Sequence, residues 1–567
     1  MASPLEPFLH THRIAYFSME IGLRSEIPTY SGGLGVLAGD TLRSAADLRI
    51  PLVGVTLVSR MGYFRQEIDA QGRQVERPAP WEPSQWAVSL DAKIGVPIEG
   101  RNIWVQGWLY ALEGGTGYRV PVILLDTDLP ENAPEDREIT HYLYGDGPDY
   151  RLKQEIVLGM GGARMLQALG FTVHAYHMNE GHSALLSLEL LRRYERDSEE
   201  VGPGESIYDV GKVRELCLFT THTPIEAGHD KFDYPLVERL LDGFVDMGEL
   251  RTLAGNEHLN MTQLALRLSG YVNGVAKSHA AVSNAMFPGY HVHAITNGVH
   301  PGTWTSPSFQ ALYDKHVANW RHEPELLVRA DQIPDEEIWA AHLTAKRALI
   351  ARVRELTGVE LDHERPILGF ARRMTAYKRP DLLLSDPGRL QSIAAEHGLQ
   401  IVFAGKAHPK DEPGKQLIER LNEAGRRLRP KVSIVFLPGY DMELGHLMTS
   451  GSDIWLNTPL RPLEASGTSG MKAAFNGVPN LSVLDGWWIE GCIEGVTGWS
   501  VGDGATPEAN SGDGKGLYRK LEEKVLPLFH QDRAGWIAVM KGAISKNAYY
   551  FNSHRMMRRY ATGAYIR

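Results

Sequence analysis

The stretch Glu464-Ala-Ser-Gly-Thr-Ser-Gly-Met-Lys472 follows an apolar run at 454–456 and leads into a helix-like segment at 471–476. The apolar run predicts a buried parallel strand, and a second strand is predicted at 481–484. A turn of small residues between strand and helix leaves backbone N–H groups free at the positive helix end, where an anion can bind. With Glu464 and Lys472 at its edges, the stretch favours a sugar-phosphate site or an aldehyde cofactor held as a Schiff base. Such turns also occur commonly without any ligand, and a lysine at a helix start is more often exposed to solvent. The other segments of the chain must therefore show whether this stretch is a binding site.

The composition is that of a globular protein with two large domains. The chain has 567 residues, 43% hydrophobic and 23% charged, which is too long for one compact core. Its net charge of −10 argues against non-specific binding to nucleic acid or to a membrane surface.

Cys217 and Cys492 stand in apolar contexts without metal-ligand spacing, so we expect reduced thiols and no metal. Residues 1–13 carry no apolar signal-peptide core and no stretch approaches the roughly 20 apolar residues of a spanning helix, so we expect a cytoplasmic protein.

The first half opens with a strand at 14–20, the loop Tyr30-Ser-Gly-Gly-Leu-Gly35, a helix at 37–48 and a strand at 52–57. This order predicts a βαβ unit of the doubly wound kind, in which adjacent glycines let the backbone approach a ligand. The spacing is not G-x-G-x-x-G, so a dinucleotide site has little support.

Polar side chains end two further predicted strands of the first half. A strand at 173–178 leads into Asn179-Glu180-Gly181-His182, and a strand at 216–221 leads into His222. The carboxyl ends of strands in an open α/β sheet are where ligands bind. His182 by itself favours a capping or packing role, whereas His222 fits a sugar-hydroxyl contact and a structural role about equally.

Other predictions for the first half concern its architecture. Residues 81–125 are rich in aromatic and strand-forming residues and predict a β-rich insertion. Residues 271–282 read as a helix, and a turn at 294–298 places a domain boundary near Gly298.

The second half begins another α/β unit with a strand at 367–370, followed by Ala371-Arg-Arg-Met-Thr-Ala-Tyr-Lys-Arg-Pro380. Arginine forks match phosphate oxygens and lysine supplies a point charge, so this cluster predicts a phosphate site rather than a solvated basic face. Strands follow at 401–404 and 432–437, the latter leading into Tyr440. The aromatic run at 485–490 fits either a sugar-binding surface or a closed core, and the helical tail at 517–567 could cross back onto the first domain.

Taken together, these segments resemble the α-glucan phosphorylase family, which includes glycogen, starch and maltodextrin phosphorylases. The most specific match is Glu464-Ala-Ser-Gly-Thr-x-x-Met-Lys472, and further matches occur in the same order: Gly32-Gly33-Leu34-Gly35, Asn179-x-x-His182, Thr221-His222-Thr223, Thr296-Asn297-Gly298 and Arg373-x-x-x-Tyr-Lys378-Arg379. The resemblance implies an α/β fold of two Rossmann-like domains facing a deep cleft, the GT-B arrangement, with domains at 1–298 and 299–567.

The resemblance also implies a role for each matching residue. Lys472 is expected to bind pyridoxal 5′-phosphate as a Schiff base. The other expected cofactor contacts are Arg372, Thr468, Ser469, Tyr440 and Gly33. Inorganic phosphate is expected at Arg373, Lys378, Gly32 and Gly33. The glucosyl unit is expected at Glu464, Ala465, Ser466, Gly467, His222 and Asn297. Among these, Lys472, Arg373, Lys378, His222 and Glu464 form the expected catalytic set.

The activity implied by the resemblance is phosphorolysis of an α-1,4-glucan, which releases α-D-glucose 1-phosphate with retention while the cofactor phosphate donates or relays a proton. Two neighbouring phosphates repel each other, so cations are required around them. The implied partners are a glucan and inorganic phosphate, and a homodimer is expected by analogy only. The alternatives are a nucleotide-sugar glucan synthase of the same fold, which typically carries a glutamate at the place of Lys472, and a non-catalytic glucan-binding relic.

Some positions depart from the better-known members of that family. Arg372 stands where many have lysine, Ser469-Gly470 replaces a Gly-Asn pair, and Glu180 replaces an aspartate. We expect these positions still to bind their ligands, with altered geometry. The chain is shorter than the animal and plant enzymes, so we expect neither their phosphorylation switch nor their nucleotide effector site.

Overall fold

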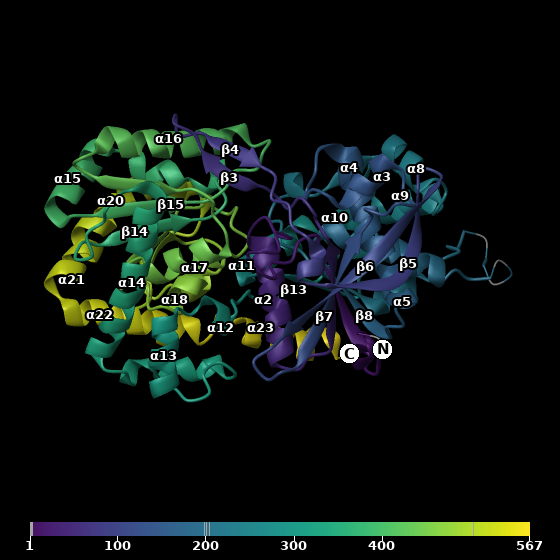
Figure 1. Cartoon of the computed structure of the whole chain (residues 1–567), viewed down its shortest axis with the longest axis horizontal. Coiled ribbons are helices and arrows are strands. Elements are labelled where there is room, and N and C mark those ends of the chain that lie inside the picture. Colours follow the sequence, from purple (N-terminus) through teal and green to yellow (C-terminus); the bar gives the residue numbers. More distant parts are fainter. Residues whose placement is uncertain (1–3, 198, 200, 203, 503, 567) are drawn as a thin grey trace.

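The computed structural model describes residues 4–566 apart from 198, 200, 203 and 503, so the outermost ends of the two expected domains, 1–3 and 567, lie outside the described residues. It is an α/β structure with two large sheets, one in each half of the chain (Figure 1). We call the part around the first sheet the first lobe and the part around the second sheet the second lobe.

The first sheet has nine strands in the order β13-β12-β9-β8-β1-β2-β7-β6-β5. Their bounds are β1 Arg13–Phe17, β2 Leu52–Leu57, β5 Val88–Ile98, β6 Arg101–Glu113, β7 Arg119–Asp126, β8 Val173–Asn179, β9 Cys217–Thr220, β12 Tyr271–Gly274 and β13 Val292–Ala294. The strands from β13 to β7 pair in parallel, and β6 and β5 add antiparallel pairs at one edge. The segment expected as a β-rich insertion therefore extends the main sheet.

The second sheet has six parallel strands in the order β16-β15-β14-β17-β18-β19. Their bounds are β14 Ile367–Ala371, β15 Gln400–Ala404, β16 Ser433–Leu437, β17 Ile454–Asn457, β18 Asn480–Val483 and β19 Gly498–Val501. Their apolar runs are buried almost throughout, as expected when helices cover both faces of a parallel sheet.

Both sheets share one strand order. Counted along the chain, the strands from β7 to β12 and those from β16 to β19 each run 3-2-1-4-5-6, the doubly wound order. The order reverses between β1 and β8 in the first sheet and between β14 and β17 in the second. Ligands bind at such switch points, so the segments that follow these strands are the natural place for a site.

Helices cover the sheets on both sides. Those of the first half are α1 Glu6–Leu9, α2 Gly33–Asp47, α3 Pro134–Arg137, α4 Gly147–Ile156, α5 Gly162–Ala168, α6 Leu186–Arg193, α7 Val210–Leu216, α8 Tyr234–Leu241, α9 Met247–Ala254, α10 Met261–Arg267 and α11 Lys277–Met286. Those of the second half are α12 Pro301–Trp304, α13 Pro307–His316, α14 Asp335–Thr357, α15 Pro387–His397, α16 Glu412–Leu428, α17 Met442–Gly451, α18 Ser469–Ala474, α19 Trp488–Gly491, α20 Asp513–Lys520, α21 Leu526–Gln531, α22 Arg533–Gly542 and α23 Ser553–Tyr560. No helix among the described residues is long and apolar enough to cross a membrane.

The helix expected at 271–282 is wrong in its first part. Residues 271–274 form β12, which pairs in parallel with β9 and β13, and α11 begins only at Lys277. The sheet supplies pairing partners on both sides of this segment, and that tertiary pairing overrides the helical pattern of the sequence.

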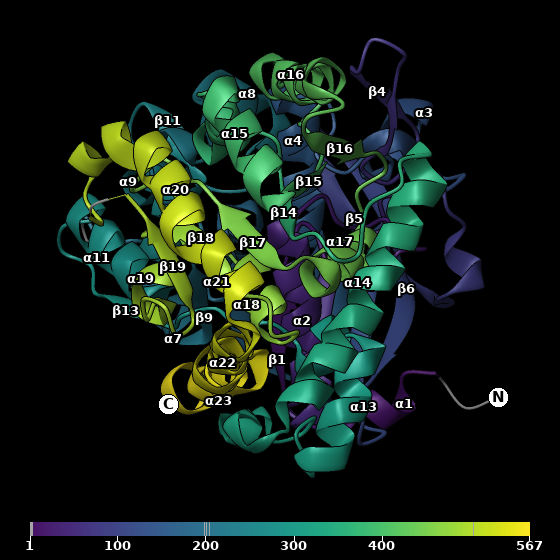
Figure 2. The ribbon, with the colours of Figure 1, turned by 90° about the vertical axis from the view of Figure 1, so that its left-hand side faces the viewer.

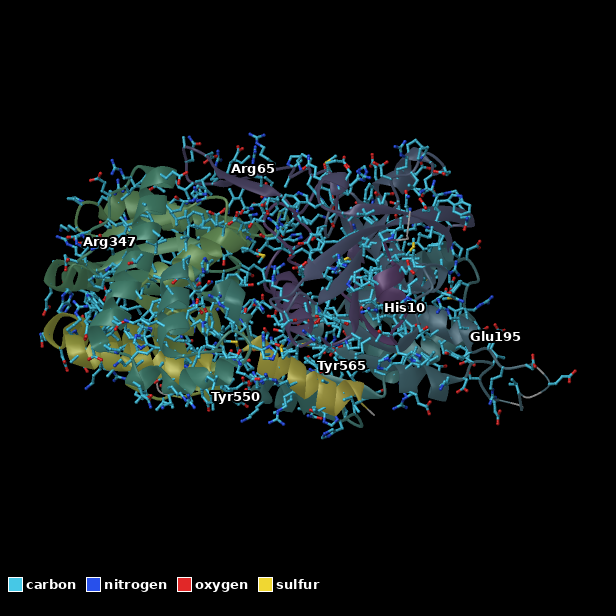
Figure 3. All side chains as sticks on the ribbon, turned by 60° about the horizontal axis from the view of Figure 1, so that its bottom comes forward. His10, Arg65, Glu195, Arg347, Tyr550 and Tyr565 are labelled. Atoms are coloured by element: carbon cyan, nitrogen blue, oxygen red, sulfur yellow. The ribbon has the colours of Figure 1, made fainter. Side chains whose placement is uncertain are left out.

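The C-terminal segment runs along the second lobe and ends on the first (Figures 1 and 2). Figure 3 labels Tyr550 and Tyr565 on this segment, and the Tyr565 hydroxyl lies 2.9 Å from Nδ1 of His177 in β8. In α23, Tyr560 lies 3.2 Å from the Thr220 hydroxyl and accepts a hydrogen bond from Asn273. The tail is therefore bonded to three strands of the first sheet.

Candidate functional site

A pocket of about 1350 Å³ is lined by residues of both lobes. Its walls include the segments that follow the switch-point strands β1, β8, β14 and β17, as the doubly wound order leads one to expect, together with segments that follow other strands of both sheets. Every residue predicted for the site lines this one pocket: Gly32, Gly33, His222, Asn297, Arg372, Arg373, Lys378, Tyr440, Glu464, Ala465, Ser466, Gly467, Thr468, Ser469 and Lys472.

Lys472 lies in α18 and faces the pocket with little exposure to solvent. Its Nζ is 3.6 Å from the ring centroid of Trp304, whose indole N–H donates to Asp40. Burial lowers the pKa of Lys472 to about 8. An amine with that pKa has a larger unprotonated fraction at neutral pH than a surface lysine and is accordingly more nucleophilic.

Glu464 is the centre of an ion-paired cluster. Its Oε2 accepts hydrogen bonds from Nη2 of Arg372 at 2.7 Å and from Nζ of Lys378 at 2.6 Å. Burial by itself raises the pKa of this carboxyl, but the two cations outweigh burial and lower the pKa to about 2. Asp485 accepts a hydrogen bond from the Glu464 N–H and fixes the backbone there.

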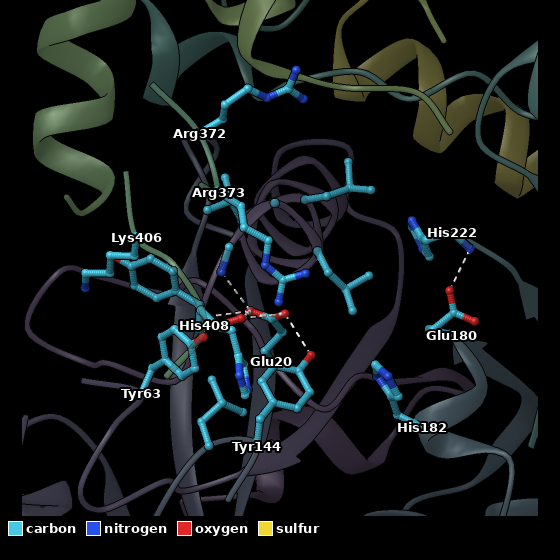
Figure 4. A pocket seen from close by; sticks show the side chains of 18 of the residues that line it. Glu20, Tyr63, Tyr144, Glu180, His182, His222, Arg372, Arg373, Lys406 and His408 are labelled. Carbon is cyan, nitrogen blue, oxygen red and sulfur yellow. Dashed lines mark hydrogen bonds between the residues drawn. The ribbon is translucent and has the colours of Figure 1, made fainter. Parts of the chain in front are cut away.

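The neighbouring arginines point in different directions. Figure 4 shows Arg373 directed towards Glu20, whereas Arg372 extends away from it. Arg372 also donates to Asn457, and its buried Nε has no hydrogen-bond partner in the part of the chain that the structure describes. Arg373 lines the pocket. Desolvation lowers the pKa of its guanidinium, but Tyr63, Tyr377 and Glu20 outweigh desolvation and raise the pKa above its ordinary value, so the guanidinium stays charged.

The Glu20 carboxylate anchors the glycine-rich loop at residues 30–35. This carboxylate accepts hydrogen bonds from the N–H groups of Ser31 and Gly32 at 2.5 and 3.2 Å and from the Tyr144 hydroxyl at 2.8 Å. A Cβ added at Gly32 or Gly33 would meet no atom within 4 Å, so the backbone faces open space there. The loop can therefore offer a ligand backbone contact without an intervening side chain.

His222 is neutral and oriented. Its Nε2 lies 2.7 Å from Oδ1 of Asn179, which accepts, so Nε2 carries the proton and Nδ1 is left as an acceptor. Burial lowers the pKa of His222 to about 3. Glu180 accepts from the His222 N–H at 2.8 Å, and the buried Oδ1 of Asn297 has no partner among the described residues.

The loops around Lys472 complete the wall of the second lobe. Gly467 has φ +76°, a left-handed conformation that favours glycine, and Thr468 stands at the N-cap position of α18 without a capping hydrogen bond from its side chain among the described residues. Ser469 accepts a hydrogen bond from the Trp455 indole at 3.1 Å. Tyr440 follows β16, and burial raises its pKa to about 12, so its hydroxyl remains protonated.

The sequence patterns gave no role to several other residues of the pocket: Glu20, Tyr63, Tyr144, Arg151, Asp230, Lys406 and His408. Glu20 and Lys406 follow strand ends, a signal that could have marked them. His182 was expected to pack or cap; it lines the pocket, with Nε2 3.4 Å from Asp230 and with Nδ1 buried and unpartnered. The aromatic run at 485–490, left open between a sugar surface and a core, buries Trp487 and Trp488 in the second-lobe core.

Asp47, His300 and His554 meet outside the pocket, with one potential metal-ligand atom of each within 4.8 Å of the others. His300 Nδ1 accepts from the Thr303 N–H, so Nε2 carries the proton and donates to Asp47 at 2.8 Å. That proton occupies the lone pair a metal would need. The other histidine, His554, lies with Nδ1 3.0 Å from the Ser44 hydroxyl, so hydrogen bonds link α2 to the start of α12 through His300 and to α23 through His554.

Comparison with known proteins agrees with the sequence motifs. The family model of carbohydrate phosphorylases matches residues 245–496. A maltodextrin phosphorylase of Thermococcus litoralis is 40% identical over 97% of this chain and 70% of its own length, and a glycogen phosphorylase of Aquifex aeolicus is 35% identical over 97% and 86%. An uncharacterised protein of Methanocaldococcus jannaschii is 32% identical over 97% of this chain and 99% of its own length. The chain therefore belongs to the carbohydrate phosphorylase family, the glucan phosphorylases that its motifs resemble.

Proposed function

We propose that this protein catalyses phosphorolysis of α-1,4-glucan: inorganic phosphate attacks the terminal glucosyl C1, the bond from C1 to the glucan oxygen breaks, and that oxygen takes up a proton. The products are α-D-glucose 1-phosphate, with configuration retained, and a glucan one unit shorter. We further propose the GT-B arrangement, with domains at 1–298 and 299–567 and the tail crossing back.

One observation carries the proposal. Six separate sequence segments contribute to one pocket, and they bring cations and hydroxyl-binding groups to the same place. A phosphate and a sugar are the ligands that such a combination suits, since guanidinium and ammonium groups bind phosphate oxygens while histidine and amide groups bind hydroxyls.

The residues present fit pyridoxal phosphate. Lys472 offers a buried amine with a lowered pKa, and Arg372 offers a buried Nε without a partner, which an anion can satisfy. We propose that Lys472 attaches the cofactor and that Arg372, Thr468, Ser469, Tyr440 and Gly33 hold it. When bound, the cofactor supplies a phosphate group that exchanges a proton with the substrate phosphate.

The residues of the chain then have separate tasks. Arg373 and Lys378, with the backbone at Gly32 and Gly33, bind and orient inorganic phosphate against the glucosyl C1. Their positive charge stabilises the anionic groups gathered in the transition state. His222, Asn297, Glu464 and the backbone at 465–467 hold the glucosyl hydroxyls, and the buried walls exclude water that would hydrolyse the sugar.

The test is to incubate the purified protein with maltodextrin and inorganic phosphate and to measure glucose 1-phosphate. We expect release that depends on both substrates, and a near-ultraviolet absorbance that borohydride fixes to the peptide containing Lys472. A colourless protein that transfers glucose from a nucleotide sugar would instead support the synthase alternative, and a protein that binds maltodextrin without turnover would support a relic.

A further inference from the structure

A hairpin of the first half lies against the second lobe. Its strands are β3 Arg65–Ile68 and β4 Gln74–Arg77, and Figure 1 shows them beside α16. Each strand carries a buried glutamine: Gln66 is 3% exposed and Gln74 is 6% exposed. The two side chains are joined, because Nε2 of Gln66 donates to Oε1 of Gln74 at 2.9 Å.

Both amide side chains bind the backbone of second-lobe loops that follow β15 and β16. Gln66 donates to the Gly405 carbonyl at 2.8 Å and accepts from the Gly439 N–H at 3.1 Å. Gln74 accepts from the Ala407 N–H and donates to the Ala407 carbonyl, both at 3.0 Å. The hairpin thus supplies hydrogen-bond partners that these loops do not find in their own lobe.

These loops support the cations of the pocket. The Met374 N–H donates to the Lys406 carbonyl at 2.9 Å, and a Cβ added at Gly405 would lie 1.9 Å from the Arg372 carbonyl oxygen. The backbone that carries Arg372 and Arg373 therefore rests directly on the loop that the glutamines hold. Gly439 precedes Tyr440, so the same hairpin also fixes a second wall of the pocket.

We propose that Gln66 and Gln74 are positioning residues for the phosphate-binding wall: the first-lobe hairpin places loops 405–407 and 439–440, and through them the arginine pair. This role rests on the proposed function. Both glutamines act through other residues and do not touch substrate themselves. Its physical basis is that buried backbone groups need partners, so removing a glutamine frees the loop to seek others.

The chain offers a matched control on the same hairpin. At its tip, Arg426 donates to the Gln71 carbonyl at 2.7 Å and Asn422 donates to the Gly72 carbonyl at 3.1 Å. Both come from α16, and neither side chain has a hydrogen bond to residues 405–407 or 439–440 in the described part of the chain. Arg426→Ala weakens the docking of the hairpin and leaves the glutamine contacts in place.

The kinetic test compares Gln66→Ala, Gln74→Ala and Arg426→Ala as holoenzymes. For the glutamine variants we expect kcat/KM for inorganic phosphate to fall by about 10- to 100-fold while KM for maltodextrin stays within about twofold. Gln66→Glu keeps the acceptor for Gly439 but places a carboxylate against the Gly405 carbonyl, so we expect no rescue. A similar loss in Arg426→Ala, or an unchanged phosphate dependence in both glutamine variants, would overturn the proposal.

A second measurement does not depend on turnover. Amide hydrogen exchange at Ala407 and Gly439 should accelerate at least about tenfold in Gln74→Ala and Gln66→Ala respectively, and should not change in Arg426→Ala. Unchanged exchange at both amides would refute the positioning role even in an active enzyme. Absence of glucose 1-phosphate from the wild-type protein would refute the proposed function while the exchange experiment still tests the glutamines.

Discussion

A histidine on one wall of the pocket and a glutamate on the other differ in charge. On the first-lobe wall, His222 is neutral because burial lowers its pKa to about 3, and it is bonded to the uncharged amide of Asn179. On the second-lobe wall, Glu464 stays ionised between Arg372 and Lys378 at 2.7 and 2.6 Å. The difference matches the proposed reaction, in which a neutral imidazole binds a sugar hydroxyl while the cations beside Glu464 neutralise anionic groups.

The same contrast separates two lysines of the second lobe. Lys378 is ion-paired with Glu464, whereas Lys472 lies over the Trp304 ring and has a pKa lowered to about 8. The environment therefore pairs one lysine with a carboxylate and makes the other a more nucleophilic amine.

The largest effect is expected at that amine. Lys472→Ala should reduce glucose 1-phosphate release by at least about 1000-fold, because the cofactor loses its attachment. Mass spectrometry after borohydride treatment should find no labelled peptide at 472. In the wild-type apoprotein, cofactor attachment should accelerate as the pH rises through about 8, because only the unprotonated amine reacts.

The control for this prediction is Lys406→Met. Burial also lowers the pKa of Lys406 to about 8, but its Nζ donates to the Phe64 carbonyl at 3.0 Å. Labelling at 472 should survive this change. Labelling that moved to Lys406, or persisted without Lys472, would contradict the distinction between the lysines.

The next effect is expected at the exposed cation of the second-lobe wall. Arg373→Ala should reduce turnover by about 100- to 1000-fold with cofactor still bound, since a guanidinium fork to phosphate is lost. Kinetics at varied phosphate concentration measure this loss. The control is Arg347→Ala, at an exposed position of α14, which should leave the rate unchanged. Phosphorolysis near the wild-type rate by Arg373→Ala would mean that Arg373 does not bind the substrate phosphate.

Glu464→Gln tests the ion-paired cluster through stability. The folded carboxyl has a pKa of about 2 against an ordinary 4.5, so its pairing contributes up to ~3 kcal/mol that is fully present above about pH 4.5 and is lost as the pH falls towards 2. Urea unfolding of the ligand-free protein should show the variant less stable at pH 7, with the gap to wild type narrowing below pH 4.5. A gap that did not depend on pH would show that lost packing, not charge, is responsible.

The smallest effect is expected at the neutral histidine of the first-lobe wall, His222. His222→Asn should reduce turnover by about 10-fold through a lost hydroxyl contact. Because the pKa of His222 is about 3, its removal should not shift any inflection of the rate profile between pH 5 and 8. An inflection that disappeared with His222 would show that this histidine titrates during turnover and is not held neutral.

Local sequence patterns predicted the strands that carry the site, because a buried parallel strand needs a continuous apolar run wherever it lies. They failed at 271–274, where pairing with β9 and β13 outweighs helical periodicity. They could not place Asp230 beside His182, because the two residues lie far apart along the chain.

The amino-acid sequence alone determined the α/β class, the order of the motifs, the residues expected at the site and the membership of the family, since strand runs, glycine turns and basic clusters are local. Only the tertiary structure decided which groups are charged and which are held in place. Trp304 reaches Lys472 and Gln66 reaches Gly405 across long stretches of chain. Desolvation and long-range hydrogen bonds depend on every element that packs around a group, and no local window of sequence contains that information.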